Sequence, residues 1–408
     1  NCLDISQNKL TKILKDLENK KIIVFRKFKN AYALFSGSDI DLDELTELNK
    51  SKIKDDYDII LSQLPQLQPI VAKKHFHETG TQRIYQRFCL VLTNIKKAVE
   101  EIVRLDISPA SAGAFIFLCK TKEDTQKDFE DKLKELSQIK FPKPVIIGTS
   151  KNFNEFFNYA LEIAALKRVK STVDAIEGDA IAKKELNGRL TAYQNLLFNS
   201  LYLNFENADW TFNKNKVKEN NLSAIASLIS NEVFKLTPII HNELVVRDRL
   251  SGMSMNGATI LLNRVFNNSH LKNLGMEGNP SEFGIYLSLI KSNNLHIKKG
   301  DEFVISIENT KNKSIKTIYD EFLKLIKGSK EAVNVSDIYA HFVKQPYGIK
   351  IGLLPILIGI FFKATEASCA FYNKDEQGRE SLITEFDQKT AERMYHMPET
   401  LKIMFVKI

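Results

Sequence analysis

The chain has 408 residues, enough for two to four domains, and its 43% apolar and 26% charged fractions are those of an ordinary soluble globular protein. Its net charge of +8 is modest for this length. Because nucleic-acid footprints are usually concentrated basic faces, only residues 1–35, with eight basic residues against three acids, and residues 73–104 qualify as such a face.

The compartment is predicted from what the sequence lacks. The longest apolar run, Ile351–Phe362, is shorter than the roughly 20 residues of a spanning helix, so we expect a buried core helix and no membrane contact. The sequence begins at Asn1 and has no signal-peptide pattern, which we interpret as a fragment of a longer polypeptide. The four cysteines, Cys2, Cys89, Cys119 and Cys369, have no CxxC spacing, which favours a reducing, cytoplasmic compartment.

Residues 1–50 predict the back half of a winged helix. Leu10 to Lys21 has helical spacing, residues 22–28 and 31–35 alternate as strands, and Lys29-Asn30 is the turn. The acidic stretch from Asp39 then opens another helix; we prefer this to a calcium loop because the EF-hand order is missing. The basic side chains of this hairpin, together with two lysines further on, are the predicted nucleic-acid contacts: Lys20, Lys21, Arg26, Lys27, Lys29, Lys73 and Lys74.

Residues 51–170 predict a small α/β domain. Continuous apolar strands separated by helices indicate a parallel sheet that is covered on both faces. The predicted strands are 87–92, 113–119 and 144–148, and the predicted helices are 95–104, 123–137 and 153–169. Thr149-Ser150 follow the third strand, but neither GxxxxGKS/T nor GxGxxG occurs in the sequence, and Gly328-Ser329-Lys330 lacks the preceding glycine and strand.

The rest of the chain predicts a helical domain over 171–330 and a second winged-helix module over 331–408. The helical domain is interrupted by a short strand at 210–212. The last module has helices at 337–343 and 349–362, strands at 367–372 and 382–384, a helix at 387–396 and a strand at 402–406. The predicted fold class is therefore α/β plus mainly helical: a small parallel α/β sheet, a central helical domain and winged-helix-like modules at both ends.

His75 and His77, followed by Glu78, are the best metal candidates. On a strand they would face the same side, with Glu78 beside them, but no third ligand cluster is evident and HExxH is absent. Ordinary hydrogen-bonded histidines are favoured, so no metal is expected. The surrounding segment Ala72–Arg87 is basic, and it predicts either a contact with phosphate, nucleic acid or an acidic partner, or a solvated loop.

The segment from Pro238 to Arg249 is dense in polar groups and forms a candidate interaction or nucleotide-sensor face. In a helix, Glu243 and Arg247 are four apart and can pair, while Asn242 and Arg249 fall on one face. Structural pairing is the favoured alternative, because helical ion pairs need no ligand.

Four blocks of the sequence resemble the C-terminal half of large prokaryotic P-loop ATPases from phage-defence loci, including the BREX type. The blocks are LENKKIIVFRKFKNAYALFSGSDIDLD (17–43), PIVAKKHFHETG (69–80), TPIIHNELVVRDRLS (237–251) and KQPYGIKIGLLPILI (344–358). The resemblance implies an ATP-driven complex that acts around foreign DNA, with ATP and Mg²⁺ bound by an upstream core.

The predicted function is a non-catalytic regulatory or interaction region that couples an upstream ATPase to a protein partner or DNA. No cofactor is expected in this chain itself. Two alternatives stay open: a stand-alone winged-helix DNA-binding regulator, and a hydrolase with a metal site near His75 and His77.

Overall fold

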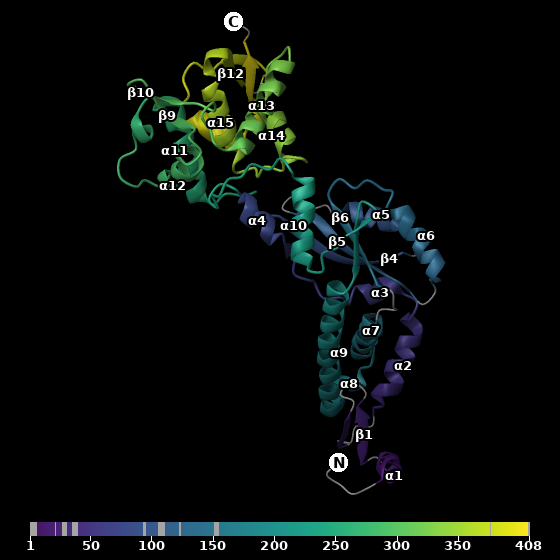
Figure 1. Cartoon of the computed structure of the whole chain (residues 1–408). Helices are drawn as coiled ribbons and strands as arrows, with labels where there is room; N and C mark the ends of the chain where they lie inside the picture. The colour runs from purple at the N-terminus through teal and green to yellow at the C-terminus, as the bar shows by residue number, and fades with distance from the viewer. Residues whose placement is uncertain are drawn as a thin grey trace.

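The molecule is elongated, with its two ends at opposite poles (Figure 1). The structure is a computed structural model, and it describes residues 6–20, 22–26, 31–34, 40–92, 95–104, 111–121, 124–150, 155–375 and 377–406. From the N-terminal pole a hairpin leads into a bundle of helices, then into a sheet, and finally into a second α/β lobe (Figure 1). No helix in the described part of the chain is both long and apolar enough to cross a membrane.

The N-terminal unit is a helix followed by an antiparallel hairpin, as the sequence predicts. Helix α1 (Gln7–Asn19) precedes β1 (Ile23–Arg26), which pairs with β2 (Ala31–Leu34) so that Arg26 faces Ala31. The predicted turn at Lys29-Asn30 lies outside the described residues. That this unit is half of a winged helix stays a prediction.

A helical bundle connects the hairpin with the sheet (Figure 1). The acidic stretch after Asp39 opens a helix, as predicted. The Asp41 carboxylate caps this helix because it accepts hydrogen bonds from the backbone N–H groups of Asp43 and Glu44. The bundle helices are α2 (Leu42–Ile53), α3 (Tyr57–Leu61), α7 (Phe156–Thr172), α8 (Ala175–Gly178) and α9 (Ala180–Glu206).

A six-stranded mixed sheet lies at the centre, in the order β3-β4-β5-β6-β7-β8. The three predicted strands are β4 (Ile84–Val91), β5 (Ser111–Cys119) and β6 (Val145–Thr149), and they are parallel. Strands β3 (Ile70–Val71), β7 (Asp209–Phe212) and β8 (Asn215–Lys216) extend the sheet antiparallel at its two edges.

Both faces of this sheet are buried, as the continuous apolar strands predict. On β5, Phe115 and Phe117 point into the core that contains α7 and α9, whereas Ile116 and Leu118 point into a smaller core with α5 (Ile95–Arg104) and α6 (Gln126–Leu136). This alternation follows from the two-residue period of a strand.

The second lobe has a separate core that begins at Ile240, whereas the bundle and sheet core ends at Phe234. Helix α10 (Leu222–Val233) packs with the sheet. Only a short connection joins it to the second lobe. The chain between 171 and 330 therefore contributes to both cores, and the predicted four-part division at 50, 170 and 330 stays a prediction.

The second lobe contains a small antiparallel sheet ordered β11-β14-β12-β13 and a separate hairpin β9-β10. Its elements are α11 (Gly252–Asn267), 3-10 turns at Lys272–Gly275, Glu366–Ser368 and Pro398–Thr400, α12 (Phe283–Ile285) continuing as the wider turn Tyr286–Lys291, β9 (His296–Lys299), β10 (Glu302–Ile305), α13 (Lys313–Gly328), β11 (Val333–Asn334), α14 (Val335–Val343), α15 (Leu354–Ala364), β12 (Cys369–Lys374), β13 (Glu380–Leu382), α16 (Gln388–His396) and β14 (Leu401–Phe405).

Helix α15 is the centre of the second core. Every residue from Leu354 to Phe362 is buried, which confirms the prediction that this apolar helix is internal. Pro355 lies in its first turn, where the missing N–H costs nothing. A helix in the major groove must show polar side chains to base edges, whereas the apolar side chains of α15 face the core.

Candidate functional site

Three distant segments of the chain meet where the two cores join. The end of α4 (Lys73–Thr79) packs on α10 and leads into β4, the connection 234–250 passes beside it, and the loop 344–352 comes from the second lobe. Figure 1 shows α4 and α10 between the sheet and the second lobe. Three of the four sequence blocks quoted above, 69–80, 237–251 and 344–358, therefore converge at this junction.

Glycines allow the close approach. Gly80 ends α4 in a left-handed conformation with φ of +76°, and a Cβ there would lie 2.1 Å from the Ile240 carbonyl oxygen. The Ile240 N–H donates to the Thr79 carbonyl at 3.0 Å. At Gly352 a Cβ would lie 2.8 Å from the Arg247 carbonyl oxygen. Larger residues cannot occupy either position without moving the backbone.

Arg83 is the central side chain of the junction. It belongs to the first lobe, is only 4% exposed, and donates through Nη2 to the Gly348 carbonyl at 2.6 Å and to Thr237 Oγ1 at 3.0 Å. Its guanidinium lies 4.0 Å from the ring centroid of Phe234. Burial lowers the pKa of Arg83 to about 10, so the side chain still carries its positive charge near neutral pH.

A second buried cation lies nearby. Lys350 Nζ donates to Asp248 Oδ2 at 2.5 Å. Burial lowers the pKa of Lys350, the Asp248 carboxylate opposes this change, and the like charges of Arg83 and Lys143 add to it. The junction therefore holds more positive than negative charge in a poorly hydrated place.

The predicted sensor face is not a helix. The segment 238–249 forms turns, because the Asn242 side chain accepts hydrogen bonds from the N–H groups of Leu244 and Val245 and so caps a local turn. Asn242 is buried and also donates to Ser288 Oγ.

Only part of the proposed sensor set is brought together. Glu243 and Arg247 form an exposed ion pair at 3.9 Å, the pairing that the sequence suggested for a helix. Arg249 is exposed and does not share a helical face with Asn242. The assignment of these residues as an interaction or sensor site stays a prediction.

His75 and His77 lie on helix α4 and not on the strand that the sequence analysis considered. Two positions apart in α4, His75 is buried and His77 is exposed, because successive helical residues turn by about 100° and not 180°. His75 Nδ1 lies 2.6 Å from Asn231 Oδ1, and Asn231 in turn donates to Glu78. Burial lowers the pKa of His75.

The contact with Asn231 gives His75 a structural role between α4 and α10. Within the described ranges, no three or more His, Cys, Asp or Glu side chains are placed to hold a metal ion. Lys73 and Lys74 are exposed at the start of α4, where their backbone N–H groups donate to the Ser223 and Ser227 hydroxyls of α10.

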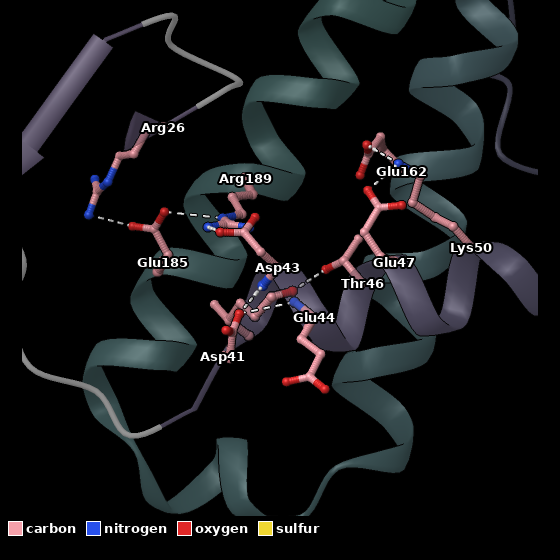
Figure 2. A network of polar contacts seen from close by, with 11 residues as sticks. Arg26, Asp41, Asp43, Glu44, Thr46, Glu47, Lys50, Glu162, Glu185 and Arg189 are labelled. Atoms are coloured by element: carbon pink, nitrogen blue, oxygen red, sulfur yellow. Dashed lines mark hydrogen bonds and ion pairs between the residues drawn. The ribbon is translucent and has the colours of Figure 1, made fainter. Parts of the chain in front are cut away.

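The predicted nucleic-acid contacts of the hairpin are partly engaged within the molecule. Arg26 Nη2 lies 2.6 Å from Glu185 Oε2, so this arginine ties the hairpin to α9 (Figure 2). Lys20 is exposed and pairs with Asp16. Lys21, Lys27 and Lys29 lie outside the described residues.

Arg26 is the first member of a longer chain of charges (Figure 2). Glu185 also contacts Arg189, which reaches Asp43 at 2.7 Å, and thus links the hairpin, α9 and α2. A second link joins α2 to α7, where Lys50 bridges Glu47 and Glu162 at 2.9 Å and 2.7 Å. Burial lowers the pKa of Lys50, but its hydrogen bonds to the two glutamates outweigh this and raise it overall. This network stabilises the bundle.

The sequence analysis did not single out Asp248 or Lys350, and it placed Arg83 only within the basic segment Ala72–Arg87, not as a buried side chain of the junction. Arg83 immediately precedes β4, and a charged residue beside a strand is too common a pattern to mark it. Its partners Gly348 and Thr237 are 265 and 154 residues away, and no local pattern points to them.

Comparison with protein-family models, with curated proteins and with solved structures found no match for this chain. The resemblance to phage-defence ATPases therefore stays a proposal.

Proposed function

We propose that this chain is a non-catalytic coupling region of an ATP-driven complex, which transmits movement between its two lobes. The observation that carries the proposal is the junction, where Arg83 of the first lobe is bonded to Gly348 of the second. A connection between lobes that merely tethers them does not require buried charges.

Buried charges make such a junction sensitive to displacement. If the lobes separate, Arg83 loses its charge-assisted hydrogen bond to the Gly348 carbonyl, which contributes roughly 1.5–3 kcal/mol, and the guanidinium is left with fewer acceptors in a buried place. A movement of one lobe is therefore resisted unless the other lobe follows. That is the mechanical property a coupling element needs.

The non-catalytic part of the proposal is supported by the sequence. No P-loop or dinucleotide motif occurs in it. If the chain resembles the phage-defence ATPases in function as well as in sequence, ATP and Mg²⁺ are bound by an upstream core, and the cytoplasm is the place of action.

We further propose that the C-terminal unit is a winged-helix-like module used for protein contact. The support is its order, helix α13, strand β11, helices α14 and α15, then strands, with β11, β14 and β12 adjacent in one sheet. The burial of α15 and the net charge of −1 over residues 331–408, from nine basic and ten acidic groups, favour packing or protein contact over DNA reading.

The catalytic question is tested by phosphate release from ATP with the purified chain. We expect no turnover above background. Turnover that a point substitution within 1–408 abolishes would overturn the non-catalytic assignment.

The coupling is tested with Arg83→Met, which keeps the length of the stem and removes the fork of donors. The matched control is Arg168→Met on the exposed side of α7. Hydrogen exchange should accelerate in 234–250 and 344–352 only in Arg83→Met. In complex with the ATPase core that the resemblance implies, Arg83→Met should lower stimulated ATP turnover, and equal stimulation by wild type and variant would refute coupling through the junction.

A further inference from the structure

Helix α9 exposes large apolar side chains on the surface that faces away from the bundle. Its inner face, which includes Leu197 and Leu201, is buried in the first core. On the outer side, Phe198 is 48% exposed, Tyr202 46% and Leu203 56%. Figure 1 shows α9 along the margin of the bundle, where it packs on α7. Because large apolar side chains are stabilised by burial, neighbouring ones on a surface indicate a contact with another molecule.

The same part of α9 carries no charge. No residue from Thr191 to Phe205 is acidic or basic, whereas 26% of the whole chain is charged. The outward face of a helix that meets only water usually carries charged residues. A nucleic-acid backbone requires a basic surface, and a charged protein partner requires charges of the opposite sign. The outer surface of α9 therefore fits a partner that is itself apolar and uncharged.

The exposed residues form one stripe along the helix, which we call the outer stripe. It consists of Gly188, Thr191, Asn195, Phe198 and Tyr202, all of them exposed. Steps of three and four residues keep them on one face, because an α-helix has 3.6 residues per turn. One charged residue lies four positions beyond each end of the stripe on the same face, Lys184 before it and Glu206 after it.

The outer stripe is complementary in size to itself. In an antiparallel pair with its two-fold axis at Asn195, each residue faces the one that lies about equally far from Asn195 in the second copy. Tyr202 then faces Gly188 of the second copy, and Phe198 faces its Thr191, so each large side chain meets a smaller one. Gly188 has room for such a neighbour, because an added Cβ would have no atom within 4 Å.

The charges at the two ends are complementary as well. The same antiparallel register places Lys184 opposite Glu206 of the second copy, and the two-fold axis repeats this pair. Glu206 also attracts Arg87 of its own chain, whose Nε donates to the Gln68 carbonyl at 2.7 Å. The pair with Lys184 therefore adds little affinity and mainly fixes the register. A parallel pair would instead place Lys184 opposite Lys184.

We propose that the outer stripe of α9 joins two copies of this chain in an antiparallel contact with two-fold symmetry. A second copy is the occupant because the stripe matches itself in both size and charge, as a two-fold interface requires. From Lys184 to Glu206 the contact is about 33 Å long and one helix wide, which is less than a standard interface, so we expect a weak dimer with a Kd on the order of 10–100 µM. This inference does not depend on the coupling function.

The test is sedimentation equilibrium of the full chain and of Gly188→Leu. The new side chain would occupy the space that Tyr202 of the second copy needs, so the Kd of the dimer should rise roughly tenfold or more. Within one molecule it meets no atom, and leucine is a better helix former than glycine, so the fold should be kept. Tyr202→Asp is a second variant at a half-exposed position and should have the same effect.

The matched control is Gly252→Leu, which adds the same side chain at an open glycine at the start of α11. It should keep the Kd of the wild type. Equal weakening by Gly188→Leu and Gly252→Leu would show that α9 has no special part in the dimer, and this would overturn the proposal.

A charge exchange tests the register. Lys184→Glu and Glu206→Lys each place like charges opposite one another, and each should raise the Kd roughly threefold to tenfold. The double variant should return to nearly the wild-type Kd. A chain that stays monomeric up to about 1 mM would overturn the proposal, since even weak interfaces of this size bind more tightly than that. A double variant that is no better than the single ones would overturn it as well.

Discussion

Gly80→Ala is the sharpest test of the contact between the two cores. The new methyl group would meet the Ile240 carbonyl oxygen at 2.1 Å, and the left-handed backbone disfavours any side chain. The backbone term costs roughly 1–2 kcal/mol. Displacing Ile240 also breaks its hydrogen bond to Thr79, which adds roughly 1–3 kcal/mol because two buried backbone groups lose their partner.

The matched control is Gly278→Ala, because Gly278 has φ of +65° and nothing lies within 4 Å of the added Cβ. Gly278→Ala should lose only the free energy of unfolding that the left-handed backbone costs an alanine. The difference between the two variants measures the contact between the lobes.

The assay is urea unfolding followed by two probes. Trp210 is the single tryptophan, is buried in the first core, and reports on that core by fluorescence, whereas circular dichroism reports on the whole chain. We expect coincident transitions in wild type and separated ones in Gly80→Ala. If Gly80→Ala and Gly278→Ala lose the same free energy and both keep coincident transitions, the argument for a tight junction is wrong.

Leu357→Asp should give insoluble or locally unfolded protein, because a carboxylate at a position with no exposure costs several kcal/mol; melting and limited proteolysis identical to wild type would show that the helix is exposed. Lys214→Gly should raise the free energy of unfolding by roughly 1 kcal/mol, since the Asn213-Gly turn removes the backbone strain; a destabilised variant in urea unfolding would contradict this. Because burial lowers the pKa of His75, the folded state prefers the neutral ring, so its contribution is complete above pH 6.5 and is lost as the pH falls below that value. In unfolding measured against pH, His75→Gln should flatten this dependence, while His296, whose pKa is also lowered by burial, contributes equally in both proteins; an unchanged slope would refute the assignment.

Local patterns predicted much of the fold. The apolar run of β5 predicted a parallel strand buried on both faces, and the apolar residues of α15 predicted an internal helix. The hairpin β1-β2 followed from alternation of apolar and basic residues. These features are readable because a residue's environment within a strand or helix repeats with the period of that element.

Short and polar segments were decided by tertiary structure. The seven residues of α4 are too few for a helical period to emerge, and their helix is supported by the Ser223 and Ser227 hydroxyls of α10. The segment 238–249 has helical spacing of charges, but the Asn242 side chain caps a turn instead.

The candidate site was also decided by tertiary structure. A charge in the sequence has many possible partners, and only folding selects one. Arg26 is paired with Glu185 and Arg83 with Gly348, over 159 and 265 residues, because burial of each cation demands an acceptor at that place. The sequence by itself determined the long apolar strands and helices and the core that they form, because their periods repeat along the chain. The three-dimensional arrangement alone decided the short polar segments, which charges are buried, and with them where the two lobes are joined.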